Sequence, residues 1–279
     1  IASIIQQAAA SQKRINEFLT TPSDILAPEV QAQSLSGHIL FDRVTFVYPD
    51  TGIKALDNVS FELKPGEKLA IIGRTGSGKS SIANLLVRLY DVTNGSILLD
   101  GKDIREINLS SLRKNIGYVP QEIFLFSDTI EDNVAFGKAG ATLDEIKQYT
   151  KYAAIYDEIS ALPEGFDTMV GERGVTLSGG QKQRVSIARA LIKQPNIVLL
   201  DDCLSAVDTT TEKQITKYLD GTLADKTSVI ITHRIYGLLN FDKIMVLEEG
   251  KIAEMGTHEE LLANKGYYFD VYETQKMEE

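Results

Sequence analysis

Apolar and polar residues follow two different periods along this chain. Residues 37–63 alternate between apolar and polar positions, as in "HILFDRVTFVYP" and "NVSFELKPG", with turn residues between the segments. This alternation predicts short antiparallel strands. The continuous apolar run at residues 67–73, "EKLAIIG", instead predicts a buried parallel strand. Further strands are expected at residues 95–101, 115–121, 196–200 and 228–232, with a hairpin at 243–256.

Helical periodicity dominates the other segments. A stripe of apolar residues predicts a helix at residues 1–19, and Pro22 and Pro28 then open a polar linker up to Ser36. Between residues 122 and 194 the strand patterns disappear, which predicts a helical subdomain inserted into an α/β core. Helices are expected at residues 80–90, 129–136, 143–162 and 180–192, and from near Glu259 onward.

Composition narrows the classes of function. A chain of 279 residues with 43% hydrophobic residues can bury a full core. Its net charge of −10 argues against a nucleic-acid groove, which needs clustered Lys and Arg. The single Cys203 excludes an internal disulfide and a multi-cysteine metal site. No stretch approaches the roughly 20 apolar residues of a transmembrane helix, and because the first residue is Ile1 we expect a fragment of a longer protein.

The segment "GRTGSGKS", residues 73–80, matches the phosphate-binding pattern G-x-x-x-x-G-K-S/T. A strand pattern precedes it and a helix pattern follows it. Glycines let backbone N–H groups approach phosphates, and the start of the helix adds a positive dipole. We expect Lys79 against the β- and γ-phosphates of a nucleotide and the Ser80 hydroxyl on Mg²⁺. The plainer alternative is a glycine turn before an ordinary helix.

Two adjacent carboxylates, Asp201 and Asp202, follow the apolar run at residues 196–200. An Asp at the end of such a strand holds the Mg²⁺ shell in phosphate-loop sites, which suits Asp201. Asp202 is then expected to act on an attacking water, as general base or by positioning it. Taken alone, Asp201 would more often be a turn residue, but the phosphate loop favours the metal site.

A second glycine motif is "LSGGQKQR", residues 177–184. Ser178 and Gln181 have the spacing of a capping box that opens the following helix. A capping box does not require Gly179 and Gly180. These glycines expose backbone N–H groups at the start of a helix, as in an anion-binding site. From this motif alone both interpretations stay open.

In this combination the chain resembles the nucleotide-binding domain of exporter-type ATP-binding cassette (ABC) transporters, over residues 36–277. Residues 73–80 stand as its Walker A motif, residues 197–201 as Walker B, and residues 177–181, LSGGQ, as the motif distinctive of the family. The resemblance implies an α/β fold of the P-loop NTPase (RecA-like) type. It would comprise a parallel-sheet core, an N-terminal antiparallel β subdomain and an inserted α-helical subdomain.

The resemblance also implies a division of the chain into domains. Residues 1–22 would be the cytosolic end of the last transmembrane helix and residues 23–36 a linker. Residues 37–279 would be the nucleotide-binding domain. Within it the core would take residues 37–121 and 195–258, the helical subdomain residues 122–194, and a C-terminal helical tail residues 259–279. Such a domain lies at the cytoplasmic face of the membrane as part of a transporter, and we expect it to be soluble as an isolated fragment.

Individual roles follow from the resemblance. Tyr48 would stack on adenine, Gln121 would touch Mg²⁺ or water, and His233 would contact the γ-phosphate. The plainer alternatives are a half-buried strand tyrosine, a polar residue ending a strand, and a core or surface histidine. The implied cofactors are ATP and Mg²⁺, the catalytic residues Asp202, His233 and Gln121, and the metal ligands Ser80, Gln121 and Asp201. The implied nucleotide-contacting residues are Tyr48, Gly73, Arg74, Thr75, Gly76, Ser77, Gly78, Lys79, Ser80, Ser81, Ser178, Gly179, Gly180, Gln181 and Asp208.

The resemblance implies partners as well. In the family LSGGQ closes on the nucleotide held by a second domain, so two domains would pair head to tail around two ATP. Asp208 would face that partner, unless it only precedes a capping box formed by Thr209 and Glu212. Residues 121–137 and "VGERG", residues 170–174, would contact the transmembrane domain of the same transporter, although charged loop residues are usually just solvated. A nucleic-acid partner is not expected.

One residue departs from the family pattern, which places Glu directly after the Walker B Asp. Asp202 is one methylene shorter, a retreat of about 1.5 Å, and a misplacement of about 1 Å can cost on the order of 10²-fold in rate. We therefore expect ATP binding with slow hydrolysis, as in one subunit of a heterodimeric exporter of drugs, lipids or peptide-like substrates. The alternatives are a fully hydrolytic homodimeric exporter domain, a soluble ABC ATPase of DNA repair or translation, a P-loop kinase or transferase, and a regulatory ATP-binding partner.

Overall fold

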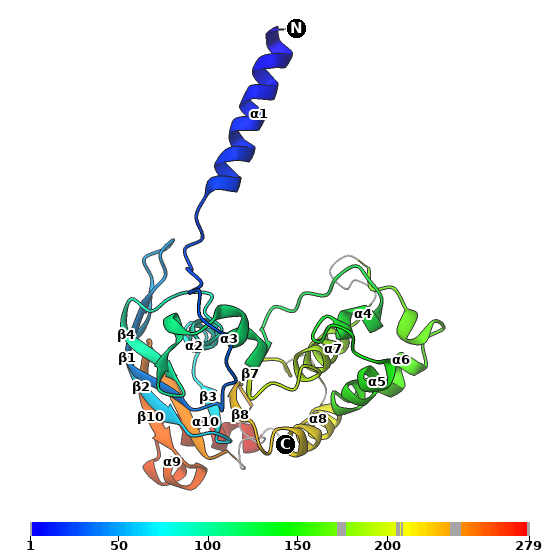
Figure 1. Ribbon diagram of the computed structural model, residues 1–279. Helices are drawn as coiled ribbons and strands as arrows, with labels where there is room; N and C mark the ends of the chain where they lie inside the picture. Colours follow the sequence, from blue (N-terminus) through cyan, green and yellow to red (C-terminus); the bar gives the residue numbers. More distant parts are fainter. Residues whose placement is uncertain (1, 172–176, 205–206, 208, 235–240, 278–279) are drawn as a thin grey trace.

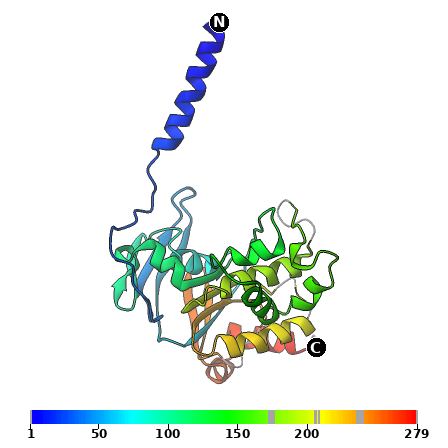
Figure 2. The same ribbon diagram turned by 45° about the vertical axis from the view of Figure 1, so that its right-hand side comes forward.

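The computed structural model describes residues 2–171, 177–204, 207, 209–234 and 241–277. Helix α1 (Ala2–Thr20) projects from an α/β body to which an extended segment joins it, as Figure 1 shows. No residue of α1 is buried, and the turned view in Figure 2 shows the same projection. The helix expected at residues 1–19 is present as α1. In the described part of the chain, no helix combines the length and the apolar character needed to span a membrane.

Among the described residues, the central sheet has six strands in the order β10-β9-β3-β8-β7-β6. Strands β3 (Lys68–Ile72), β6 (Ile116–Val119), β7 (Ile197–Asp201), β8 (Thr227–Ile231) and β9 (Lys243–Glu248) pair in parallel, and β10 (Lys251–Gly256) closes one edge antiparallel to β9. All five residues of β7 are buried, as a strand covered on both faces requires. The predicted α/β fold with a parallel sheet is confirmed.

A smaller antiparallel sheet lies beside this core. Its strands are β1 (Ile39–Val47), β2 (Lys54–Leu63), β4 (Asn94–Leu99) and β5 (Lys102–Asp103), in the order β2-β1-β4-β5. Buried and more exposed residues alternate along β1, as the sequence pattern predicts. Phe41 of β1 stacks on Phe61 of β2 with ring centroids 4.4 Å apart. The apolar side chains of this sheet share one hydrophobic core with helix α2 (Lys79–Leu86) and the central sheet.

Helix α2 is shorter than the sequence pattern predicts, because it ends at Leu86 and not near residue 90. Arg88 follows with a left-handed backbone at a φ of 52°. Arg113 donates hydrogen bonds to the carbonyl oxygens of Val87 and Arg88, at 3.2 and 2.9 Å, and holds this turn. Arg113 belongs to helix α3 (Leu109–Asn115), which the apolar pattern did not reveal and which follows a short 3₁₀ turn, η1 (Ile104–Glu106).

A second hydrophobic core lies among the helices on the right of Figure 1. These elements are α4 (Ile130–Ala135), α5 (Leu143–Tyr152), α6 (Tyr156–Ser160), the 3₁₀ turn η2 (Gly165–Asp167), α7 (Gly179–Leu191) and α8 (Thr209–Thr222). The prediction of one helix at residues 143–162 was wrong. Ala154 has a φ of 51°, and its carbonyl oxygen accepts a hydrogen bond from Arg184 of α7 at 2.8 Å. This long-range contact holds the break between α5 and α6.

The last two helices, α9 (His258–Asn264) and α10 (Tyr267–Met277), pack on the central sheet. Leu261 and Tyr268 join a third apolar cluster with Ala70 and Ile72 of β3 and with β9. The first of these helices begins one residue before the expected start near Glu259. The C-terminal helices therefore pack against β3, the strand that leads into the phosphate loop.

Candidate nucleotide-binding site

The loop at residues 73–78 joins β3 to α2 and depends on its glycines. Gly73 and Gly78 have φ values of 147° and 101°. A Cβ at Gly73 would lie 2.2 Å from the carbonyl oxygen of Leu247, and one at Gly78 would lie 2.2 Å from that of Ala55. Gly78 caps α2, and no side-chain cap occurs there among the described residues. The loop therefore offers uncapped N–H groups at a helix start, where anions bind.

Lys79 is the first residue of α2, and it is 7% exposed. Its ammonium group donates hydrogen bonds of 2.9 Å to the carbonyl oxygens of Gly73 and Arg74. Burial lowers the pKa of Lys79, while the carboxylates of Asp201 and Asp202 act in the opposite direction. A cation held at the inner end of the loop is suited to an anionic ligand.

Asp201 ends strand β7 and is 2% exposed. Burial raises the pKa of this carboxyl, and a hydrogen bond with Ser80 opposes that rise. Its Oδ1 atom has no hydrogen-bond partner among the described residues. A buried carboxylate oxygen without a partner is costly unless something binds it. A hard divalent cation fits, because carboxylate and hydroxyl oxygens are the ligands that Mg²⁺ prefers.

Asp202 follows in a left-handed conformation, with a φ of 46°. Its amide donates a hydrogen bond of 2.9 Å to the carbonyl oxygen of Ile231 in the neighbouring strand β8. His233 comes two residues after Ile231 and is exposed. The ends of β7 and β8 thus bring Asp201, Asp202 and His233 to the same edge of the sheet, because carboxyl ends of parallel strands meet there.

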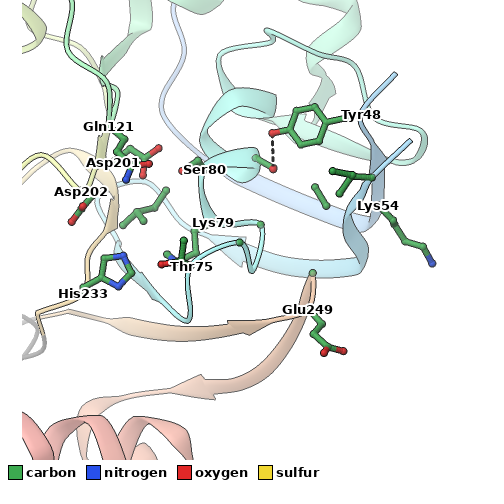
Figure 3. A pocket seen from close by; sticks show the side chains of 17 residues that line it. Tyr48, Lys54, Thr75, Lys79, Ser80, Gln121, Asp201, Asp202, His233 and Glu249 are labelled. Carbon is green, nitrogen blue, oxygen red and sulfur yellow. Dashed lines mark hydrogen bonds between the residues drawn. The ribbon is translucent and has the colours of Figure 1, made fainter. Parts of the chain in front are cut away.

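These side chains line one cavity of about 510 Å³. Figure 3 shows Lys79, Asp201, Asp202 and His233 toward one end of it, with Tyr48 toward the other. The predicted site residues that line it are Tyr48, Thr75, Gly76, Gly78, Lys79, Ser80, Ser81, Gln121, Asp201, Asp202 and His233. Gly73, Arg74 and Ser77 belong to the same loop but do not line the cavity. Their predicted roles toward a nucleotide stay predictions.

Tyr48 lies at the end of the cavity away from the carboxylates. Its ring packs edge-on against Phe46 and Tyr90, with centroids 4.7 and 5.3 Å away. Its hydroxyl lies 2.9 Å from the hydroxyl of Ser81, the contact dashed in Figure 3. Two neighbouring rings and one hydrogen bond therefore fix the orientation of this aromatic side chain.

Sequence reasoning missed one side of the cavity, formed by Lys54, Glu249 and Gly250. The amide of Gly250 donates a 3.0 Å hydrogen bond to the carbonyl oxygen of Ser77. A Cβ at Gly250 would lie 2.7 Å from the carbonyl oxygen of Ala55, and its φ of 77° also favours glycine. The turn at "EEG" is visible in the sequence, but its contact with the phosphate loop arises only when β9 pairs with β3.

The LSGGQ residues do not line this cavity. They open helix α7, and the predicted capping box is confirmed. The Ser178 hydroxyl accepts a hydrogen bond from the amide of Gln181 at 3.2 Å, and the Gln181 side chain accepts one from the amide of Ser178 at 2.9 Å. Ser178 and Gly179 are exposed. The start of α7 is therefore available at the surface, away from the phosphate loop of the same chain.

Comparison with known proteins identifies the family. A family model described as ABC transporter matches residues 56–205, from strand β2 to just beyond Asp202. The chain belongs to the ABC transporter family. This ABC domain is 47% identical over 272 residues to an uncharacterized ABC transporter ATP-binding protein, YfiB, of Bacillus subtilis, covering 98% of this chain and 47% of that protein.

Two further comparisons bear on the type of transporter. The ABC domain is 42% identical over 269 residues to an ATP-dependent lipid A-core flippase of Pseudomonas fluorescens, covering 96% of this chain and 45% of that protein. It matches the structure of a bacterial Atm1-family ABC exporter with ATP bound, with a TM-score of 0.93 and 41% identity, over 98% of this chain and 48% of the other. The chain thus spans about half the length of each of these three proteins.

Several predicted contacts of this ABC domain fall outside the described residues. Asp208 is one of them, as are the neighbouring positions 205 and 206 and the side chains of Thr209 and Glu212. In "VGERG", residues 172–174 also lie outside the described part. Val170 is buried and pairs with Asp128 through a backbone hydrogen bond of 2.8 Å. The roles predicted for these segments stay predictions.

Proposed function

We propose that this chain is the ATP-binding motor domain of an ABC exporter, with a nucleotide site that holds ATP better than it hydrolyses it. One observation carries the proposal. A glycine loop, a buried ammonium group and a buried carboxylate with one unpaired oxygen face one cavity, and each suits one part of a Mg²⁺–nucleotide complex. The exporter class rests on the flippase and exporter relatives.

Each end of the cavity suits one end of ATP. The N–H groups of the loop and the ammonium group of Lys79 bind the phosphates, so Lys79 exchanges its two carbonyl partners for phosphate oxygens. Tyr48, at the other end, offers a ring face to the adenine base. His233 contacts the γ-phosphate from the end of strand β8.

Asp201, Ser80 and Gln121 would hold Mg²⁺, which neutralises charge on the phosphates when bound. In the described residues no three His, Cys, Asp or Glu side chains form a metal cluster of their own. Mg²⁺ usually takes one or two carboxylates and completes its shell with water and substrate phosphates, which a site with Asp201 as its carboxylate would allow.

Asp202 sets the rate of hydrolysis. Its carboxylate reaches less far than that of the family Glu by about 1.5 Å, one C–C bond. Its left-handed backbone is a conformation that Asp adopts more readily than most residues. The short side chain at this position supports binding with slow turnover.

The second half of a complete site comes from a partner domain. The start of α7 is exposed and lies away from the cavity of its own chain. Two ABC domains therefore pair head to tail, each bringing Ser178–Gln181 to the ATP of the other. In a heterodimer the partner carries the hydrolytic Glu. A transmembrane domain of the same transporter uses the ATP-dependent pairing of the two ABC domains to move a drug, lipid or peptide-like substrate. The ABC domain lies on the cytoplasmic face of the membrane.

Substitution of Asp202 tests the proposal. Asp202→Glu restores the family side chain, so ATP hydrolysis should rise on the order of tenfold or more, while the Kd for ATP stays unchanged. Asp202→Asn keeps the length but removes the base, and should lower hydrolysis below that of the wild type. Lys79→Ala should abolish ATP binding and serves as the negative control.

Full hydrolysis by the unsubstituted chain with no gain from Asp202→Glu would contradict the slow-site proposal and favour a hydrolytic homodimer. Failure to bind ATP at all would contradict the motor function. A purified chain that binds nucleic acid and hydrolyses ATP only in its presence would favour the soluble ABC ATPase. A phosphorylated acceptor in place of free phosphate would favour a kinase.

A further inference from the structure

The C-terminal helix α10 contacts the nucleotide site at both of its ends. At its start, the ring of Tyr267 lies beneath the guanidinium group of Arg74 in the phosphate loop, 5.9 Å from the guanidinium carbon to the ring centroid. Near its end, the side-chain amide of Gln275 donates a 2.6 Å hydrogen bond to the carbonyl oxygen of His233. Neither Tyr267 nor Gln275 belongs to a motif recognised in the sequence.

The start of α10 is held firmly in place. The amide of Tyr267 donates a 2.6 Å hydrogen bond to the carboxylate of Glu254 in β10. Gly266 lies against that carboxylate so closely that a Cβ there would meet it at 2.5 Å. The His258 Nδ1 atom lies 2.6 Å from the hydroxyl of the fully buried Tyr268. These contacts fix α10 relative to α9 and the sheet.

The position of His233, by contrast, needs support from outside its strand. Strand β8 ends at Ile231, and His233 lies in the irregular segment that follows. Its side chain lines the cavity, yet the residue is exposed. Gln275 reaches its main chain from a segment 42 residues away. A hydrogen bond to the main chain restrains the residue and leaves its imidazole free to face the cavity.

We propose that α10 is a positioning element of the nucleotide site, in which Gln275 holds the main chain of His233 so that its imidazole stays at the phosphate end of the cavity. This inference rests on the proposed function, because it assigns Gln275 a role only through His233. Gln275 is a positioning residue and does not touch the nucleotide. Removing its N–H donor should therefore change turnover without changing the affinity for ATP.

The experiment uses the three histidines of the chain as reporters. Their ring NMR signals are recorded with and without Mg²⁺ and a non-hydrolysable ATP analogue. His233 reports the site, His258 reports the docking of α9 on α10 through Tyr268, and His38, the residue before strand β1, is the reference. Gln275→Leu should shift the His233 signals and weaken their response to the analogue. Its kcat for ATP should fall about fivefold, the loss of one hydrogen bond, at an unchanged KM.

Two variants make the test specific. Gln275→Lys keeps an N–H donor and should recover both the His233 signals and kcat. Thr274→Ala alters the neighbouring exposed residue, whose hydroxyl bonds to Asp270 within the same helix, and should behave as wild type. Wild-type kcat and His233 signals in Gln275→Leu would overturn the inference. Equal shifts of His233 and His258 would also overturn it, because the helix would then simply have undocked.

The outcomes separate this inference from the proposed function. If the analogue leaves the NMR signals of His233 unchanged in the unsubstituted chain, the proposed role of His233 is wrong. If the analogue shifts His233 but Gln275→Leu changes nothing, the proposed function stands and only the role of α10 fails.

Discussion

The hydroxyl of Tyr48 lies 2.9 Å from the hydroxyl of Ser81, so the residue that follows strand β1 is tied to helix α2, which begins at the end of the phosphate loop. Stacking of a base on an aromatic ring is worth roughly 1–3 kcal/mol. We expect Tyr48→Ala to raise the Kd for ATP about tenfold or more for that reason. Tyr48→Phe keeps the ring and loses only the bond to Ser81, so it should raise the Kd about two- to fivefold. Fluorescent-nucleotide titration measures both.

Tyr90→Phe is the matched control for Tyr48, because it keeps a ring 5.3 Å from that of Tyr48 and removes only a hydroxyl. Its affinity for ATP should equal that of the wild type. Wild-type affinity in Tyr48→Ala would show that this ring does not bind the base.

Glu158 supports the start of the LSGGQ helix. Its carboxylate accepts hydrogen bonds of 3.0 Å from the side chain of Gln181 and of 2.5 and 3.0 Å from Arg184. We expect Glu158→Gln to weaken ATP-dependent pairing of two domains several-fold, while ATP binding by the single domain is unchanged. Because Glu158 is half exposed, the loss of folding stability should be only about 1 kcal/mol. Sedimentation with ATP in an Asp202→Asn background measures the pairing. Weaker ATP binding by the monomer would contradict this prediction.

Arg189 of α7 holds the segment that follows Gln121. Its guanidinium donates to the carbonyl oxygens of Phe124 and Asn133 and to the Asn133 side chain, at 2.7 to 2.8 Å, and lies near the rings of Phe126 and Phe136. Burial lowers its pKa to about 10. Arg189→Leu should therefore reduce the free energy of unfolding by roughly 2–4 kcal/mol, because three acceptors lose a charged donor.

Arg189→Lys keeps the charge but lacks the planar fork of donors, so we expect an intermediate loss. Urea denaturation measures both variants. A loss below about 0.5 kcal/mol in Arg189→Leu, the range of ordinary surface substitutions, would show that these contacts do not stabilise the fold.

The contacts of the Asp100 carboxylate predict that the stability of the protein depends on pH. Its carboxylate accepts bonds from the amide and hydroxyl of Ser36 and from the amide of His38. Burial raises its pKa, but these bonds outweigh burial, so the pKa is lowered in the folded protein. A lowered folded pKa stabilises the protein above the unfolded pKa, and that stability is lost as the pH falls through the folded pKa.

Asp100→Asn should thus destabilise the protein at pH 7 by about 1 kcal/mol, a modest value because the residue is exposed. The difference from wild type should shrink below about pH 4, because the unfolded carboxyl is protonated near its ordinary pKa while the folded carboxyl, with its lowered pKa, keeps its charge to lower pH. Thermal unfolding between pH 3 and 7 tests this. A difference that stays constant over that range would contradict the assignment to ionisation.

Local patterns along the chain were sufficient for some features of this domain. Apolar runs predicted the buried strands, and the spacing of Ser178 and Gln181 predicted their capping box, because both depend on neighbours within a few residues. The glycines at 73 and 78 marked a loop that no other residue could form at those φ values. The predicted helix lengths were wrong where distant side chains decide them. Arg184, for example, donates a hydrogen bond to the carbonyl oxygen of Ala154 at the break in the helix expected at residues 143–162.

The sequence by itself determined the phosphate loop, the strand that ends in Asp201 and most of the residues that line the cavity. Only the tertiary structure decided that Gly250 supports the loop, that Asp202 has a left-handed backbone and that Gln275 reaches His233. The physical reason is the range of the interactions. Strand and cap patterns are set by periodicity and bonds between near neighbours, whereas these contacts form only after the parallel sheet and the C-terminal helices have packed together.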